Sequence, residues 1–260
     1  MKRETNTLAR AVPAAPHGSC SALAADGILL VDKPSGMTSH DVVDRIRRRF
    51  RFDKVGHAGT LDPQATGLLI LMIGRGTKLA NQLLAGDKVY VGAMRLGIKT
   101  DTQDADGKVV GEFDCSFVTR ARLEEEIKRL TGDIMQVPPM VSAAKKNGVP
   151  LYKLARQGKT VERQPKLVRI HEFKLCEFNP PMASFRIHSS KGVYVRTLCA
   201  DIGEALGCGA HLAQLRRESS GVFSLCDAMP LDALLALDRN GLLERMIPMT
   251  RVMQCCGIPS

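Results

Sequence analysis

Tryptophan is absent from this sequence, and the three tyrosines and eight phenylalanines leave aromatic residues at 4% of its 260 residues. No apolar run reaches the roughly 18 residues that a membrane-spanning helix needs. The first 25 residues carry basic side chains but no continuous apolar stretch of the kind that marks a secretory signal. We therefore predict a cytoplasmic protein without a membrane anchor, and a flexible N-terminal tail over residues 1–25.

The eight cysteines form no CxxC pair and show none of the usual zinc spacings. Unpaired cysteines are typical of a reducing compartment. Gly74 and Gly76 follow an apolar run, but their spacing matches neither the P-loop nor the dinucleotide-binding fingerprint. The segment KTDTQDADG resembles a calcium loop in its aspartate spacing, but no glutamate closes it as an EF-hand requires. The expectation is no metal and no cofactor.

Basic residues exceed acidic ones, with 37 Lys and Arg against 27 Asp and Glu and a net charge of +10. An excess of this size suits a polyanionic partner without identifying it. No repeat and no linker divides the chain. We expect one domain over residues 26–250, with a mobile basic loop at about 133–160 that holds Lys145 and Lys146, followed by a C-terminal tail over residues 251–260.

The most informative stretch is a polar, turn-rich segment at residues 56–67, GHAGTLDPQATG, which precedes the apolar run LLILMIG. This order predicts that Asp62 lies on a loop at the mouth of a buried strand. Pro63 fixes its own φ and favours an extended Asp62, which restrains the carboxylate. A restrained acid suits chemistry, yet aspartate often does no more than close a turn. From this segment alone, the turn is the commoner role.

Periodicity predicts the main elements. Helices are expected from Ser39 or His40, within 74–86, after a Thr119 cap, after Pro150 and from about Tyr194; strands are expected at 28–31, 68–73, 88–97 and in a hairpin at 165–190. The segment from Asp133 to Pro150 is expected to be irregular. Residues from Leu212 onward are expected to form short helices and a tail.

Several side chains admit two interpretations. Tyr90 is either a core residue of its strand or a platform on which a base stacks. Arg196, at a junction between strand and helix, is either a surface charge or part of a site. Arg47 and Arg48 lie on the polar face of the first helix, which either is simply solvated or contacts phosphate.

Five segments together resemble the TruB family of pseudouridine synthases. They are KPSGMTSHDVV, GHAGTLDPQATGLL, KVYVGAMRLGIKTDTQDADG, PPMVSAAKKNGVPLYKLARQG and SKGVYVRTLCADIGEALGCGAHLAQLRR, in family order between about Gly27 and Arg217. The resemblance implies a mixed α/β (α+β) fold with a central, mainly antiparallel sheet. It also implies isomerisation of the uridine at position 55, in the T-loop of tRNA, to pseudouridine without a cofactor.

The resemblance also implies roles for individual residues. Asp62 matches the catalytic aspartate, which acts either as a nucleophile or as an acid/base group. Arg196 matches the arginine that pairs with it, a pairing that would lower the aspartate pKa. Tyr90 matches the tyrosine that stacks on the uracil. His57 matches the residue that enters the T-loop. Asp104 matches a residue that meets other displaced bases of this loop, and Lys78 matches a basic position near the site.

The sequence departs from the family pattern in two places. Val141 stands where a tyrosine is usual, which removes a hydroxyl contact. The chain after Met249 is too short for the C-terminal RNA-binding domain of many relatives, so binding is expected to rest on the catalytic domain and the basic loop. A monomer acting on tRNA is the leading hypothesis. The same chemistry on another RNA, or non-catalytic folding of tRNA, are the alternatives.

Overall fold

The computed structural model describes residues 26–146 and 148–257. The predicted tail at 1–25 lies outside the described residues. The strands are β1 (Gly27–Lys33), β2 (Val55–Ala58), β3 (Thr66–Ile73), β4 (Lys88–Leu96), β5 (Ile98–Thr100), β6 (Val109–Glu112), β7 (Gly132–Gln136), β8 (Lys145–Lys146), β9 (Val149–Pro150), β10 (Lys166–Asn179), β11 (Met182–Ser189), β12 (Ala210–Ser220), β13 (Phe223–Ser224), β14 (Met229–Pro230) and β15 (Ile247–Pro248). The helices are α1 (Ser39–Phe50), η1 (Gly74–Leu79), α2 (Ala80–Ala85), α3 (Arg120–Arg129), α4 (Leu151–Arg156), α5 (Val195–Leu206), η2 (Leu225–Asp227), α6 (Leu231–Ala236), α7 (Arg239–Arg245) and α8 (Met249–Cys255).

The strand after the Asp62 loop, β3, is the centre of the first half of the molecule. Every residue of β3 after Thr66 is buried. A strand buried on both faces needs cover on both sides. The apolar stripe of α1 packs on the face that holds Leu69 and Leu71, while α2 and α8 contribute to the cluster on the face that holds Ile70 and Met72. Each such side chain contributes about 1.5–3 kcal/mol when fully buried.

The helix α1 starts where its sequence predicts. The Thr38 hydroxyl accepts a hydrogen bond from Asp41 N at 3.1 Å, and the Asp41 carboxylate accepts one from Thr38 N at 2.8 Å, which completes a capping box. The helix ends at Phe50, and the residue that follows, Arg51, has a left-handed backbone with φ 53°. This fixed start holds the N-terminus of α1 beside the Asp62 loop.

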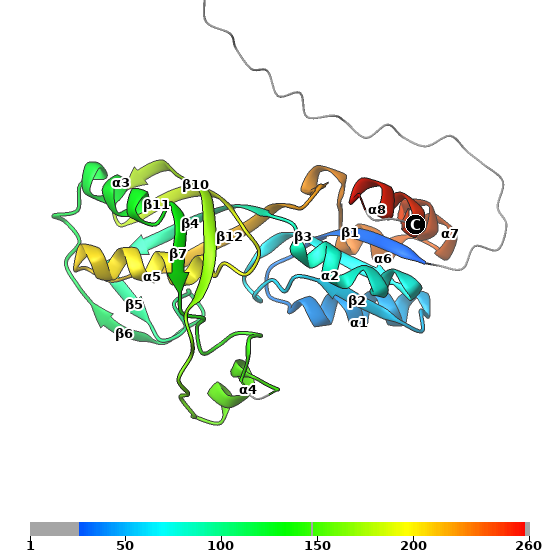
Figure 1. Cartoon of the computed structure of the whole chain (residues 1–260), viewed down its shortest axis with the longest axis horizontal. Coiled ribbons are helices and arrows are strands. Elements are labelled where there is room, and N and C mark those ends of the chain that lie inside the picture. Colours follow the sequence, from blue (N-terminus) through cyan, green and yellow to red (C-terminus); the bar gives the residue numbers. More distant parts are fainter. Residues whose placement is uncertain (1–25, 147, 258–260) are drawn as a thin grey trace, which may run out of the picture.

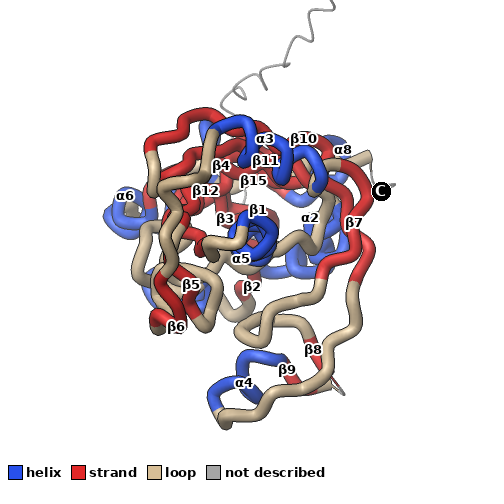
Figure 2. The backbone as a smooth tube through the Cα atoms, turned by 90° about the vertical axis from the view of Figure 1, so that its left-hand side faces the viewer, coloured by secondary structure: helices blue, strands red, loops and turns tan. Residues whose placement is uncertain are grey.

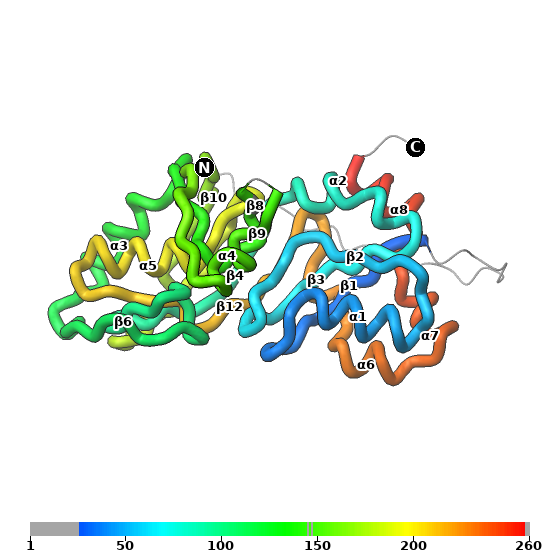
Figure 3. Tube along the Cα trace, turned by 90° about the horizontal axis from the view of Figure 1, so that it is seen from below, coloured from blue at the N-terminus to red at the C-terminus, as the bar shows by residue number. Residues whose placement is uncertain are grey.

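One continuous sheet joins two halves of the molecule, in the order β14-β1-β3-β12-β4-β11-β10-β7. Figure 1 shows the half with β1, β2, β3 and α1 on the right and the half with β4, β10, β11 and α5 on the left; the same division is visible from below in Figure 3. β12 links them, because it pairs in parallel with β3 and antiparallel with β4. Among the described strands, β1 with β14 is a second parallel pairing, so the sheet is mixed and mainly antiparallel, which confirms the predicted fold class.

The link between the halves depends on a close backbone approach. Gly67 pairs with Arg217, has φ +96°, and would place a Cβ atom 2.4 Å from the Arg217 carbonyl oxygen. A side chain does not fit there, and an L-residue would also be strained in that conformation. The junction lies five residues after Asp62 in the chain, which puts the Asp62 loop at the boundary of the two halves.

The predicted helices and the hairpin of β10 and β11 are confirmed, and three segments differ from the prediction. Residues 132–136, expected to be irregular, form β7, because they pair with β10. Residues 210–220 form β12, because β3 and β4 flank them. The part from Leu212 onward was expected to be helix or tail. Helix α8 also runs to Cys255, across the expected start of the tail at residue 251.

The predicted basic loop forms a projection from the second half. Figure 2 shows β8, β9 and α4 standing away from the sheet. The described helices include none that is both long and apolar enough to span a membrane. The seven cysteines within the described residues are unpaired.

Candidate active site

The Asp62 loop connects β2 to β3 and is held by the start of α1. The Ser39 hydroxyl donates to the Leu61 carbonyl at 3.1 Å and accepts from Leu61 N at 2.9 Å, and it is buried. Ala65 N donates to the Asp62 carbonyl at 3.1 Å, which closes a turn. Asp62 therefore does close a turn through its backbone, while its side chain stays free to point elsewhere.

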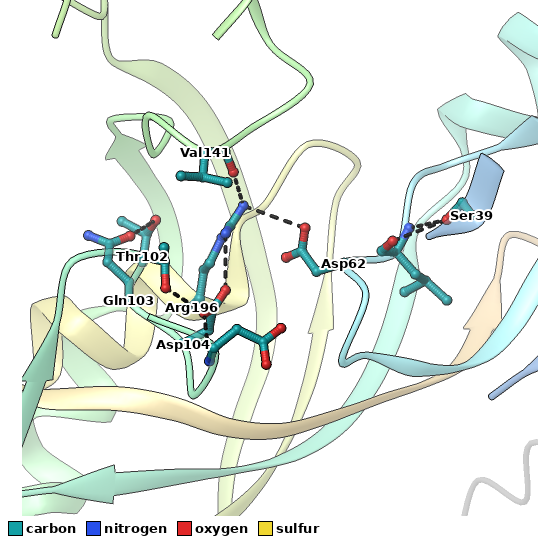
Figure 4. A network of polar contacts seen from close by, with 10 residues as sticks. Ser39, Asp62, Thr102, Gln103, Asp104, Val141 and Arg196 are labelled. Atoms are coloured by element: carbon teal, nitrogen blue, oxygen red, sulfur yellow. Dashed lines mark hydrogen bonds and ion pairs between the residues drawn. The ribbon is translucent and has the colours of Figure 1, made fainter. Parts of the chain in front are cut away.

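Arg196 faces Asp62 from the first turn of α5. Its guanidinium lies 3.5 Å from Asp62 Oδ1 and 3.2 Å from Asp104 Oδ2, and it donates to the Val141 carbonyl (Figure 4). The side chain is 4% exposed, so the surface-charge interpretation of Arg196 is wrong. One buried cation thus ties together the Asp62 loop, the turn after β5 and the segment before β8.

Asp104 is the closer of the two carboxylates. Its side chain is 6% exposed, and its Oδ1 accepts from the Thr102 hydroxyl at 2.5 Å and from Asp106 N at 3.2 Å. Both carboxylate oxygens are therefore engaged inside the protein in this structure. The contact to displaced bases that the resemblance implies for Asp104 stays a prediction.

The electrostatic balance at Asp62 differs from expectation. The resemblance predicted that Arg196 would lower the Asp62 pKa, but the pKa is raised above 3.8, because burial penalises the carboxylate more than Arg196 stabilises it. The nearby Asp104 charge raises this pKa further, and the Lys33 charge opposes it. The prediction of a lowered pKa is wrong because it counted the partner and left out the desolvation.

A cleft of about 250 Å³ opens beside these groups. Asp62, Tyr90 and Arg196, the three residues predicted to be catalytic, all line it. Tyr90 is 9% exposed and also belongs to the apolar core of the second half. The core interpretation of Tyr90 is confirmed, and because the residue also borders the cleft, its role as a platform for a base stays a prediction. The cleft is of a size to accept a single planar ring of a small ligand.

Three buried cations near the cleft were missed by the sequence analysis. Arg217 is 1% exposed and donates to the carbonyls of Leu68 at 2.7 Å and Gly59 at 3.1 Å. Lys88 also lines the cleft, and burial lowers its pKa to about 8. The carbonyl partners of Arg217 come from segments that the sheet brings near, whereas those of Lys88, at Leu84 and Gly86, lie in the turn just before it.

Lys33 is the third of these cations. It is fully buried at the end of β1, where its ammonium donates to the carbonyls of Pro34 at 2.8 Å and Pro63 at 3.0 Å. Burial lowers the Lys33 pKa to about 8, while the charge of Asp62 opposes the change. The residue next to Asp62 is thus pinned by a buried ammonium.

The residues predicted to bind RNA are spread over the molecule. His57 lies on β2, half-buried, and its Nδ1 has no hydrogen-bond partner among the described residues. Burial lowers the His57 pKa, and the nearby Arg217 charge adds to this. His57 does not line the cleft but belongs to the strand that leads into the Asp62 loop.

Lys78 does not lie near Asp62. It is exposed on η1, where its charge acts on Asp26 at the start of β1. Asp62 lies by the opposite end of β1, and seven residues of strand at about 3.3 Å each separate the two ends by about 20 Å. The prediction that Lys78 lies near the site is wrong, because the antiparallel course of β1 and β3 carries the chain away from the loop.

The other predicted cations are exposed or on the projection. Arg47 and Arg48 lie near the C-terminus of α1, where Arg47 pairs with Asp44 at 2.8 Å. Lys145 and Lys146 form β8, and the Lys146 ammonium donates to the Glu162 carbonyl at 2.8 Å. These positions leave phosphate contact for α1 and for the projection as a prediction.

The fold resembles that of a chain in a solved protein complex. A solved structure titled as a Cbf5-Nop10-Gar1 complex contains a chain that superposes with a TM-score of 0.68 and 27% identity, over 88% of this chain and 62% of that chain. This chain therefore spans less than two thirds of that structural relative.

The sequence comparisons then give the family. The model described as TruB family pseudouridylate synthase (N terminal domain) matches residues 47–195, and the tRNA pseudouridylate synthase B C-terminal domain matches residues 196–254. A protein from Opitutus terrae named tRNA pseudouridine synthase B is 50% identical over 86% of this chain and 92% of its own length, and one from Dechloromonas aromatica is 47% identical over 90% and 78%. The chain belongs to the TruB family of pseudouridylate synthases, and it is an enzyme, an isomerase.

Proposed function

We propose that the protein converts a uridine in the T-loop of tRNA to pseudouridine, with Asp62 as the catalytic carboxylate and Arg196 and Tyr90 as its partners. The observation that carries the proposal is the 3.5 Å ion pair between Asp62 and Arg196 at the wall of the cleft that Tyr90 also lines. The names of the relatives support tRNA as the substrate. The T-loop as the target rests on the sequence resemblance.

The proposed reaction breaks the bond between uracil N1 and ribose C1′ and forms a bond between C5 and C1′. The hydrogen on C5 leaves and N1 gains one, so the product is an isomer of the substrate. Asp62 either attacks the sugar as a nucleophile or removes a sugar proton in a glycal-type route. In both routes the carboxylate acts in its ionised form, and the Arg196 charge, which favours that form, opposes the effect of burial.

The cleft is too small for stacked RNA, so the target base must leave its stack. Flipping costs a few kcal/mol. Stacking on one aromatic side chain returns about 1–3 kcal/mol per base, and in this proposal Tyr90 supplies it. His57, five residues before Asp62, is proposed to hold the T-loop open beside the cleft.

Release of tritium tests the catalytic assignment. Purified protein is incubated with a T-loop transcript that carries tritium at uracil C5, and the label that appears in water is counted. We expect release by the wild type and none above background by Asp62→Asn. Asp53→Asn, which changes an exposed carboxylate in the loop before β2, is the matched control and should release label at the wild-type rate. Equal release by Asp62→Asn and the wild type would refute the role of Asp62.

Affinity for RNA is proposed to draw on the arginines of α1. If Arg47 and Arg48 each contact a phosphate, the double variant Arg47→Ala/Arg48→Ala should lower the slope of log affinity against log salt by about 0.7–0.9 per lost contact. The control is Arg120→Ala/Arg129→Ala on α3, which removes two exposed arginines that are paired with glutamates of their own helix. Equal slopes for the two double variants would count against the α1 surface.

The same chemistry on another RNA, within a larger particle, is the second candidate. It is favoured by the structural relative, whose title names a complex with two further proteins. The relatives at 47–50% identity support tRNA instead. The two candidates differ in what the assay needs. The tRNA proposal is supported if the isolated chain, a monomer by gel filtration, is active on a bare T-loop transcript. The other candidate is supported if activity requires a guide RNA or partner proteins.

A further inference from the structure

Two histidines and an aspartate converge on the face of the sheet opposite the cleft. Asp87 Oδ2 lies 3.2 Å from His171 Nε2 and 3.8 Å from His188 Nε2. The two imidazole rings are 4.6 Å apart between centroids and are tilted by 40°. His188 follows Ile187, which pairs with Tyr90 of the cleft, so the alternation of β11 turns His188 to the other face.

The backbone brings these three residues together by specific devices. The pairing of β10 with β11 shifts register between Ile170 and Glu172, and this bulge leaves both His171 and Glu172 on the exposed side of β10. Bulges of this kind re-aim side chains and are common beside functional sites. Asp87 sits just before β4, and its carbonyl accepts from Gly221 N at 2.7 Å. All three positions are therefore held by the sheet or by its direct neighbours.

The geometry suits a metal with nitrogen and oxygen ligands. In tetrahedral zinc sites, His nitrogen and carboxylate oxygen lie about 2.0–2.2 Å from the ion, which places ligand atoms about 3.3–3.5 Å apart. The two Asp87 to histidine distances, 3.2 and 3.8 Å, bracket this separation. All three ligand atoms lie within 4.8 Å of one another. Three protein ligands leave the remaining position for water.

The site is open to solvent, and its surroundings are close to neutral. The side chains of Asp87, His171 and His188 are 48%, 31% and 40% exposed, so an ion can reach them. The carboxylate of Glu172, which follows His171, and that of Glu218 flank the guanidinium of Arg186 at 3.7 and 3.2 Å. Lys88, the neighbour of Asp87, turns its ammonium into the protein toward the carbonyls of Leu84 and Gly86.

We propose that Asp87, His171 and His188 form a binding site for a divalent transition-metal ion of the zinc class. Imidazole together with a carboxylate is a donor set for Zn²⁺, Co²⁺ and Ni²⁺ rather than for Mg²⁺ or Ca²⁺. A bound ion would tie the start of β4 to the hairpin of β10 and β11. The site is separate from Asp62 and does not depend on the proposed reaction.

Zinc titration of the whole protein tests the site. The protein is stripped with a chelator and titrated with ZnCl₂ by calorimetry, with MgCl₂ as a second titrant. We expect one Zn²⁺ per chain and no comparable binding of Mg²⁺. His188→Ala and His171→Ala should each weaken zinc binding by at least about tenfold, since loss of a ligand must cost no less than the 10–100-fold known for groups that only orient ligands. Zinc should also raise the thermal unfolding midpoint of the wild type and not that of His188→Ala.

Matched controls keep the result specific. His40→Ala removes an exposed histidine that lies 3.7 Å from a single carboxylate, Asp44, and it should leave zinc affinity unchanged. Cys255→Ser/Cys256→Ser removes adjacent thiols that could hold zinc instead. Zinc affinity that is unchanged in both histidine variants would overturn the proposal. Loss of zinc binding in the cysteine variant, with binding kept in the histidine variants, would assign the zinc to the thiols and would overturn it as well. Circular dichroism of each variant verifies that a loss of binding is not a loss of fold.

Discussion

The most informative perturbation of the cleft is Asp104→Asn, which removes one charge and keeps the shape of the side chain. Asp104 is the closer carboxylate partner of Arg196, at 3.2 Å against 3.5 Å for Asp62, and it is nearly fully buried. Without this charge, Arg196 keeps its bond to the Val141 carbonyl but loses the ionic contact that holds the other side of its guanidinium in position. We expect Arg196 to be less well placed for the reaction although RNA binding is preserved.

The expected size of the effect follows from the type of contact. A hydrogen bond to a charged group contributes about 1.5–3 kcal/mol. If that energy is lost in the transition state, kcat should fall about 10- to 150-fold, since each 1.36 kcal/mol is tenfold. The KM for a T-loop transcript should change little. The control is Asp106→Asn, which alters an exposed carboxylate in the same turn and should leave kcat within a few-fold of the wild type.

The pH profile gives an independent readout. The Asp104 charge raises the Asp62 pKa, so its removal lowers that pKa. Because the ionised carboxylate is the active form, the acid limb of kcat should move to lower pH in Asp104→Asn. A raised KM with unchanged kcat would refute this reasoning and would instead support a contact between Asp104 and displaced bases. An acid limb that stays in place would show that the two carboxylates are not coupled.

Three further predictions concern stability. Lys33 has a folded pKa of about 8 against 10.5 as its ordinary value, so the unfolded chain binds more protons between these two pH values. The free energy of unfolding should therefore rise with pH in this range. In Lys33→Met this rise should be smaller, as urea titrations at pH 8 and 10 would show. Gly67→Ala should destabilise the protein by about 2–5 kcal/mol through strain and overlap with β12. The control Gly207→Ala, at a position with φ +78° and open space, should cost about 1–2 kcal/mol. Equal losses in denaturant titrations would contradict the close approach of the Gly67 and Arg217 backbones. Asp62 has a raised pKa, so its charge is unfavourable in the folded state above that pKa, and Asp62→Asn should raise the thermal midpoint at pH 7 and raise it less at acid pH. A lowered midpoint at pH 7 would show that the pair with Arg196 outweighs the burial.

The zinc-class site and the cleft occupy opposite faces of the sheet. Asp87 immediately precedes Lys88, which lines the cleft, so an ion held by Asp87 would rest on the same piece of backbone. If zinc binding at Asp87 alters the position of Lys88 in the cleft, added zinc should change the kcat of the wild type and leave that of His188→Ala unchanged. Binding alone, without a change in kcat, leaves the site as a structural one.

Elements with a strong local signal were predictable from the sequence. The apolar stripe of α1 and its capping box, the buried run of β3 and the turn residues of the Asp62 loop all act over a few neighbouring positions. The placement of Asp62, Tyr90 and Arg196 on a loop, a strand and a helix start also follows from such local patterns. Their meeting in one cleft was implied by the resemblance alone.

Elements whose stability depends on distant partners were not predictable. The segment AHLAQLRRESS has no clear alternation, and it forms β12 because β3 and β4 supply hydrogen bonds on both sides. The same pairing buries Arg217 against the backbone carbonyls of Leu68 and Gly59. The convergence of Asp87, His171 and His188 likewise depends on a bulge in β10 that no residue pattern in the sequence predicts.

The sequence by itself determined which residues are chemically able to act, because type, spacing and turn chemistry are local properties. The tertiary structure decided how they act. It buried Arg196 between two carboxylates, raised the Asp62 pKa where pairing alone predicted a lower one, and carried Lys78 to the far end of β1. The physical reason is that desolvation and charge coupling depend on which chain segments meet in space, and strand pairing between distant segments sets those meetings.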